Sequence, residues 1–206
     1  MKKRFSSKRS NLITFILLMV VLVVAGLLVY YQYMHKQQRQ DVVQTPATET
    51  EKLLAKDMEM GYPETPAELM KLWCRFNQCI YNTRLDDEQL KTLSKQIRVM
   101  YSAELLEKNS EESHFTKLKE EVTEFQSNKK RIVSYSADAG VSPVYKKIKN
   151  RKNAKVRIYY FINEGNGYVK QYQDYILVRE DEKWKILGFK KVSEEKTVSK
   201  EEALAE

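Results

Sequence analysis

AKVRIYYFINEGNGYVKQYQDYILVRE, residues 154–180, carries the clearest structural signal in this chain of 206 residues. β-Branched and aromatic residues fill both halves of it, as is typical of strands. Asn166–Gly167 stands between the halves and predicts a two-residue hairpin turn, because both central positions of that turn need φ above zero. Asp181–Glu182 predicts a second tight turn. The sequence therefore predicts an antiparallel meander, whose other strands are 131–137, 144–148 and 183–192.

The strand predicted at 154–164 is apolar on both faces, because alternate residues of a strand point to opposite sides of the sheet. One face carries Val156, Ile158, Tyr160 and Ile162, and the other carries Tyr159 and Phe161. One face must pack on helices, and the other must meet a partner or stay partly solvated. Tyrosines on strands more often pack or form protein interfaces than stack on nucleic-acid bases. The sheet-surface contacts that we predict are Tyr159, Phe161, Tyr172 and Tyr175.

Helical periodicity precedes these strands. Thr65-Pro66-Ala67-Glu68 is a capping box with proline at the first helical position, so a helix should begin at residue 66. The predicted helices are 49–60, 66–81, one beginning at Asp86–Asp87, one beginning at Ser102, and 111–126. Helices followed by a meander define an α+β domain, in which about four helices pack on one face of a curved antiparallel sheet.

A second strong signal lies near the N-terminus, where residues 11–33 read NLITFILLMVVLVVAGLLVYYQY. The twenty residues from Leu12 to Tyr31 carry no charge, and as a helix they would span roughly 30 Å, the thickness of a bilayer's hydrocarbon core. A cleaved signal peptide is the rival interpretation, but its apolar region is shorter and small residues follow it. The sequence therefore predicts a retained transmembrane helix.

Basic residues on the two sides of this segment predict its orientation. Five precede it, Lys2, Lys3, Arg4, Lys8 and Arg9, and two follow it closely, Lys36 and Arg39. Because cytoplasmic flanks carry the excess of Lys and Arg, the N-terminus should be cytoplasmic. The predicted location is the plasma membrane, with a single pass and the C-terminal domain on the extracytoplasmic, cell-wall side.

The net charge of +8 is unevenly distributed. Residues 41–128 hold 11 basic and 17 acidic side chains, whereas residues 129–193 hold 16 and 6. The densest basic stretch, 146–157, has seven Lys or Arg and no acid. It predicts either a contact with an anionic surface or a solvated edge that discourages aggregation, and at most a weak nucleic-acid contact. The candidate contact residues are Lys146, Lys147, Lys149, Arg151 and Lys152.

Reactive groups are sparse in the sequence. Cys74 and Cys79 are five residues apart on one predicted helix, too far round it for a disulfide, so we expect two free thiols, with Cys74 facing away from the apolar stripe. His114 is expected to be a solvated residue near a helix end. Asp174 is expected to face outward and pair with a cross-strand lysine, with a pocket acid as the alternative. We therefore predict no catalytic residue, no metal site and no cofactor.

The predicted organisation has five parts: a cytoplasmic tail 1–10, a transmembrane helix 11–33, a linker 34–63, an α+β domain 64–192 and a charged tail 193–206. This layout, with the helix opened by TPAELMKLWCRFNQCIYN and the meander VRIYYFINEGNGYVKQYQDYILVREDEKWKILGFKKV, resembles the inner-membrane scaffold family of type IV secretion systems, the eighth VirB component. It is most similar to the Gram-positive conjugation versions, the PrgL-like proteins. An Asn-Pro-x-Gly motif of Gram-negative members is absent, because no proline here follows asparagine.

The resemblance implies a nuclear-transport-factor-two-like or cystatin-like domain and a non-enzymatic assembly role. It implies a homo-oligomer that contacts other secretion-channel membrane proteins during conjugative DNA transfer. The alternatives are a membrane-tethered ligand-binding module of the same fold, a cell-envelope or division protein, and an enzyme that uses Asp174.

Overall fold

The computed structural model describes the backbone of residues 47–137 and 142–197, and the side chains of these residues up to Val192. Most of these residues belong to the compact unit Thr48–Glu206, the second of two into which the chain divides. No helix in the described part is long and apolar enough to cross a membrane. The predicted tail 1–10, the predicted span 11–33 and linker residues 34–46 lie outside the described residues.

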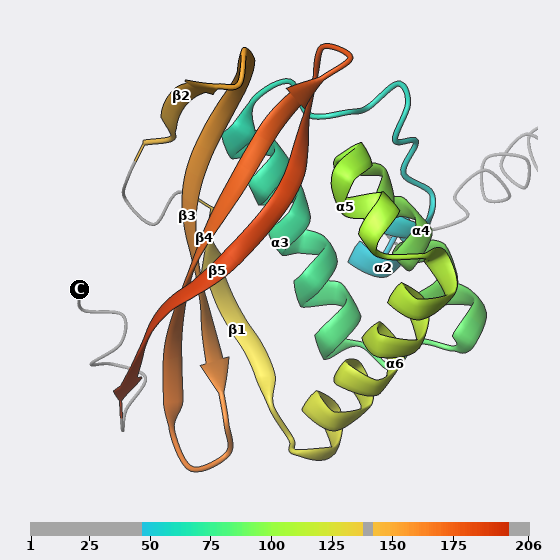
Figure 1. Cartoon of the computed structure of the whole chain (residues 1–206). Helices are drawn as coiled ribbons and strands as arrows, with labels where there is room; N and C mark the ends of the chain where they lie inside the picture. Colours follow the sequence, from blue (N-terminus) through green and yellow to red (C-terminus); the bar gives the residue numbers. More distant parts are fainter. Residues whose placement is uncertain (1–46, 138–141, 198–206) are drawn as a thin grey trace, which may run out of the picture. The chain divides into compact units, whose positions relative to one another are not determined.

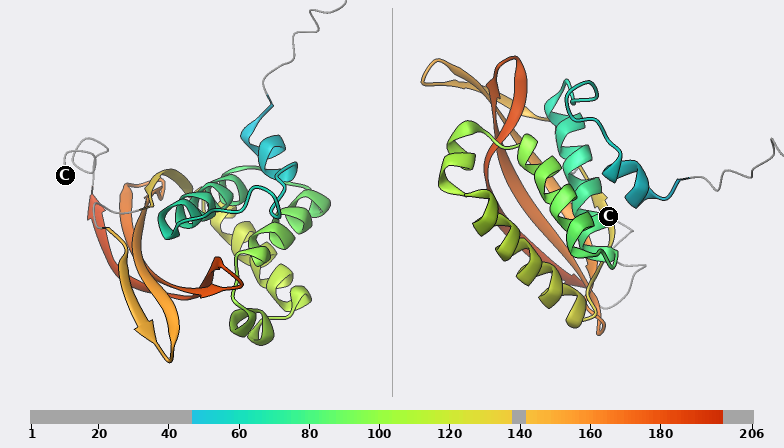
Figure 2. Two further views of the ribbon diagram at one scale, coloured as in Figure 1. Left: turned by 90° about the horizontal axis from the view of Figure 1, so that it is seen from above. Right: turned by 90° about the vertical axis from the view of Figure 1, so that its right-hand side faces the viewer.

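The described elements form an α+β domain, as predicted (Figure 1). Its helices are α2 (Glu49–Leu54), α3 (Pro66–Asn82), α4 (Asp87–Val99), α5 (Ala103–Lys108) and α6 (Glu111–Ser127). Its strands are β1 (Arg131–Ser136), β2 (Val144–Ile148), β3 (Arg151–Asn163), β4 (Tyr168–Glu180) and β5 (Lys183–Thr197). The described helices lie together on one face of the twisted sheet, and none of them covers the other face (Figure 2).

Helix starts follow the local capping chemistry that the sequence predicts. The Thr65 hydroxyl accepts a hydrogen bond from the backbone N–H of Glu68, whose carboxylate accepts one from the Thr65 N–H. Asp86 caps α4 in the same reciprocal way. The prediction for 49–60 is too long, because Asp57 accepts hydrogen bonds from the N–H groups of Glu59 and Met60 and so holds a turn there.

The sheet is antiparallel, in the order β1-β3-β4-β5. Strand β3 is long enough to pair with two strands along one edge, with β1 through residues 159–163 and with β2 through residues 151–155. The free edge of β5 is partly covered, since the Ser102 N–H donates to the Ile186 carbonyl at 2.9 Å and the Ile186 N–H donates to the Met100 carbonyl at 2.7 Å. Strand β5 also runs to Thr197, so the prediction that the tail begins at residue 193 is wrong.

The turn between β3 and β4 differs from its prediction by one residue. The Glu164 N–H donates to the Gly167 carbonyl at 2.9 Å, so the central positions are Gly165 and Asn166. Gly165 takes φ +84°, which a glycine adopts without steric cost at the first central position of a type II′ turn. The turn predicted at Asp181–Glu182 is confirmed, with φ of +46° and +59°.

The core lies between α3 and the helix-facing side of the sheet. Phe76, Leu69 and Ile80 of α3 are fully buried, as are Val156 and Ile158 of β3. The assignment of Val156, Ile158, Tyr160 and Ile162 to one packed face is therefore confirmed. Both thiols are free as predicted, and Cys74, which was predicted to face away from the apolar stripe of this helix, is nevertheless fully buried. Helix α3 is central enough to be covered on more than one side.

Candidate interaction surface

Three of the exposed large apolar residues of the sheet lie on one hairpin, residues 144–152, which we call the basic arm. Strand β2 and the start of β3 form its two sides, and Lys149 and Asn150 form the turn with φ of +46° and +63°. Every residue of the arm is exposed. Val144, Tyr145 and Ile148 keep 47%, 60% and 51% of their surface in solvent. The charge of this stretch is predicted above but the exposure of these apolar side chains is not, although the predicted strand VYKKI contains all three of them.

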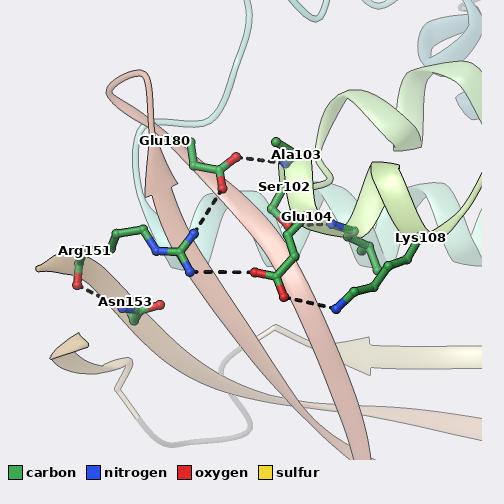
Figure 3. Close-up of polar contacts among 8 residues, drawn as sticks. Ser102, Ala103, Glu104, Lys108, Arg151, Asn153 and Glu180 are labelled. Carbon is green, nitrogen blue, oxygen red and sulfur yellow. Dashed lines mark hydrogen bonds and ion pairs between the residues drawn. The ribbon is translucent and has the colours of Figure 1, made fainter. Parts of the chain in front are cut away.

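One of the five predicted contact residues, Arg151, is held by the domain itself (Figure 3). Its guanidinium lies 3.7 Å from a Glu104 carboxylate oxygen and 3.8 Å from one of Glu180. Glu180 also accepts a hydrogen bond from the Ala103 N–H at 3.0 Å, so this cluster ties the arm to α5 and to the β4–β5 hairpin. Arg151 therefore has acidic partners within the domain, although its side chain remains 43% exposed.

The other four predicted contact residues, Lys146, Lys147, Lys149 and Lys152, are exposed. Within the described part of the chain none of them forms an ion pair. Four exposed lysines and three exposed apolar side chains thus share one short hairpin. The lysines favour a negatively charged partner, and the exposed apolar side chains favour one that also offers an apolar region.

Tyr159 and Tyr172 lie side by side on the sheet face that none of the described helices covers. Their ring centroids are 5.8 Å apart in an edge-to-face arrangement, and both residues are half-buried. The Lys170 ammonium lies 5.0 Å from the Tyr159 centroid and 5.6 Å from that of Tyr172. These two tyrosines remain candidates for contact with a partner.

Phe161 and Tyr175 are not surface contacts, so that part of the prediction is wrong. Phe161 is 1% exposed and stacks on Tyr168 with the centroids 4.9 Å apart. Tyr175 is 2% exposed and pairs with Val156 across β3 and β4, so the pleat turns it toward the helices. There the Trp73 indole N–H donates to the Tyr175 oxygen at 2.9 Å.

Asp174 faces away from the helices and is paired with cross-strand bases, as predicted. Its carboxylate accepts two hydrogen bonds from Arg157, at 2.6 and 3.0 Å, and lies 2.6 Å from the Lys155 ammonium. The Arg157 hydrogen bonds are the main cause that lowers the pKa of Asp174 to about 2, from the ordinary 3.8. A carboxylate tied in this way is a structural anion and a poor proton acceptor.

His114 is not the solvated residue that the sequence predicts. Its Nδ1 lies 3.1 Å from the Ser94 hydroxyl and its Nε2 lies 3.1 Å from the Tyr101 hydroxyl, so the ring bridges α6, α4 and the segment after α4. Burial lowers the pKa of His114, and nearby Arg98 lowers it further. Among the described residues, no group of three or more His, Cys, Asp or Glu could hold a metal ion.

The contribution of His114 to the stability of the domain should decrease as the pH falls below neutral. The unfolded chain protonates this ring near pH 6.5, whereas the folded domain does so only at lower pH. The stability that the neutral ring contributes is therefore present above pH 6.5 and is lost as the pH falls below it. Urea unfolding of the wild type and of His114→Gln at pH 8 to 5 should show an advantage of the wild type that shrinks on acidification. An advantage that stays constant with pH would contradict this prediction.

Together these elements define the class of protein as an α+β domain whose helices cover one face of an antiparallel sheet. The family model described as Domain of unknown function (DUF6715) matches residues 1–189, and the chain belongs to this family. No curated protein and no solved structure matches the chain. The family match covers both the predicted membrane segment and nearly all of the described domain.

Proposed function

We propose that this protein is a membrane-anchored scaffold subunit of a type IV secretion channel for conjugative DNA transfer. It acts by self-association and by contact with other channel subunits, and residues 12–31 hold it in the plasma membrane with the α+β domain outside the cytoplasm. The layout of the chain supports this proposal through its resemblance to the VirB scaffold family. In that assignment the domain is nuclear-transport-factor-two-like or cystatin-like.

The observation that carries a contact function is the apolar surface at both edges of the sheet. At one edge β2 exposes Val144, Tyr145 and Ile148, and at the other β5 exposes 61% of Phe189 and 42% of Val192. Sheet edges are ready templates for pairing with another chain, and proteins usually protect them. Apolar side chains on both edges favour a subunit that meets neighbours on two sides.

The polar groups that an enzyme would need support a structural role instead. Arg157 and Lys155 hold Asp174, and Ser94 and Tyr101 hold His114. Asp174 also lies on the opposite side of the sheet from the helices, so it does not line a pocket between helices and sheet. A hollow of about 710 Å³ runs along α6, and the described residues that line it all belong to that helix. These placements disfavour the enzyme and the ligand-binding alternatives.

Plasmid transfer from a host that encodes the protein tests the proposal. Deleting the gene should abolish transfer, and the full-length chain should restore it. A Phe189→Ser/Val192→Ser double variant should reduce transfer about tenfold or more, as a loss of about 1.4 kcal/mol of contact energy would. Met60→Ser is the matched control because Met60 is 89% exposed but does not lie in the sheet. Undiminished transfer after deletion would overturn the secretion assignment, provided that immunoblotting confirms the loss of the protein.

A further inference from the structure

The basic arm projects from the sheet as a two-stranded hairpin (Figure 2). Among the described strands, β2 pairs with β3 alone, through residues 144–148 and 151–155, so no described strand lies along its other edge. Arg151 pairs with Ile148 next to the turn, so its ion pairs with Glu104 and Glu180 hold the turn end of the arm near α5 and the β4–β5 hairpin. The arm is therefore held in a defined position, while the side chains of residues 144–152 stay exposed.

Apolar side chains are exposed on both faces of this projection. Val144 and Ile148 are four residues apart on one strand and so share a face, and Tyr145 lies on the opposite face. The Tyr145 ring lies 5.9 Å from that of Trp184, yet 60% of the residue is exposed. A flat protein surface could cover one of these faces, whereas a fluid lipid interface can surround both.

The charge of the arm favours the same partner. No acidic residue occurs between Ser142 and Asn163, and Lys146, Lys147, Lys149 and Lys152 are all exposed. Lysine side chains can keep their ammonium groups among lipid headgroups while their methylene stems lie along apolar groups. Tyrosine suits the same boundary, because its ring is apolar and its hydroxyl is polar. Aliphatic residues framed by lysines and one tyrosine therefore match an anionic lipid interface.

We propose that the basic arm docks on an anionic phospholipid surface, with Ile148 and Val144 entering the headgroup boundary and the four lysines meeting phosphate groups. This inference rests in part on the proposed function, because the predicted span would hold the domain close to a bilayer. Residues 32–47 join the span to the domain, and sixteen residues reach at most roughly 55 Å. A tether this short keeps the effective concentration of lipid near the arm high, so weak contacts suffice to dock the arm on the bilayer.

An environment-sensitive dye on the arm tests this docking. Cys74 is fully buried and Cys79 is 7% exposed, so a maleimide dye should react selectively at the new thiol of Ile148→Cys in the full-length chain. The labelled chain is placed in nanodiscs of phosphatidylcholine alone or of phosphatidylcholine with phosphatidylglycerol. We expect the dye emission to shift to shorter wavelength only in the anionic nanodiscs, and high salt should reverse the shift.

Two controls separate docking from general proximity. The same dye at Glu112→Cys, an exposed position at the start of α6, should not shift in either lipid. Adding Lys146→Gln, Lys147→Gln, Lys149→Gln and Lys152→Gln to the labelled arm should remove the shift. These lysines are exposed, so the thermal unfolding midpoint should stay unchanged in the quadruple variant.

Three results would overturn the proposal: no shift in anionic nanodiscs, an equal shift in both lipids, or a shift that high salt leaves unchanged. A shift in native membranes but not in protein-free nanodiscs of the same lipids would assign the arm to an acidic protein instead. The anchor is measured separately, by resistance of the chain to alkaline extraction from membranes. A chain that is extracted refutes the anchor, and the arm is then tested by adding the labelled chain to anionic vesicles.

Discussion

Replacing Phe76 with alanine should destabilise the α+β domain by about 3–5 kcal/mol, the usual cost of deleting a buried aromatic ring. Phe76 is 0% exposed and lies in the middle of α3, the helix that packs on β1 and β3. Its removal loses the transfer free energy of the ring and leaves a cavity between helix and sheet. Urea unfolding of residues 48–206, followed by the fluorescence of Trp73 and Trp184, measures the change.

Phe189→Ala is the matched control, because it removes the same ring from a position that is 61% exposed. Phe189 stacks on Tyr175 with the centroids 5.2 Å apart, so a small loss of about 1 kcal/mol is expected. Equal losses in the two variants would mean that α3 does not form the centre of the core. The comparison also matters for the proposed function, since the transfer experiment needs β5 surface variants that remain folded.

Asp174→Asn should cost about 2 kcal/mol, within the range for hydrogen bonds between charged groups. The asparagine keeps the shape of the side chain but removes the negative charge that Arg157 and Lys155 share. The Asp174 side chain is only 12% exposed, whereas those of Arg157 and Lys155 are 39% and 48% exposed. Because water can partly solvate the two cations after the change, the loss should stay below that of Phe76→Ala.

The pH dependence of this variant identifies the cause of its destabilisation. The pKa of Asp174 is lowered to about 2 from the ordinary 3.8, so its stabilising charge is fully present above pH 3.8 and is lost as the pH falls toward 2. The difference in unfolding free energy between wild type and Asp174→Asn should therefore be constant from pH 7 to 5 and should narrow below pH 4. A difference that persists unchanged at pH 3 would assign the loss to packing. Normal plasmid transfer by the variant would agree with a structural role for Asp174.

Much of the fold could be predicted because its signals are local. The Thr65–Glu68 capping box begins α3 through hydrogen bonds between residues three apart, and Asp86 does the same for α4. The β3–β4 turn was misplaced by one residue because Asn166–Gly167 and Gly165–Asn166 are both good turn pairs. The register of pairing between β3 and β4 selects Gly165–Asn166, whereas the local preferences of the turn residues do not distinguish the two pairs.

The predicted interaction residues were harder to place, because burial depends on which segments meet. Tyr159 and Tyr175 have the same side chain on neighbouring strands, yet Tyr159 is half-buried on the face that no described helix covers, whereas Tyr175 donates a hydrogen bond to Gln173 beneath α3. Arg151 reads as one more cation in a basic run. Its ion-pair partners, Glu104 and Glu180, are distant in the sequence and come close to it only in the folded domain.

The order of residues was thus enough to establish the α+β class, the helix starts, the pairing of Asp174 with bases and the basic character of 146–157. These properties depend on the periodicity, capping residues and charges of residues that are close together in the sequence. Tertiary contacts assigned His114 to a bridge between helices, Cys74 to the core and three apolar side chains to the exposed arm. Solvent exposure is a property of the packed chain, because it depends on neighbours that the sequence separates by tens of residues.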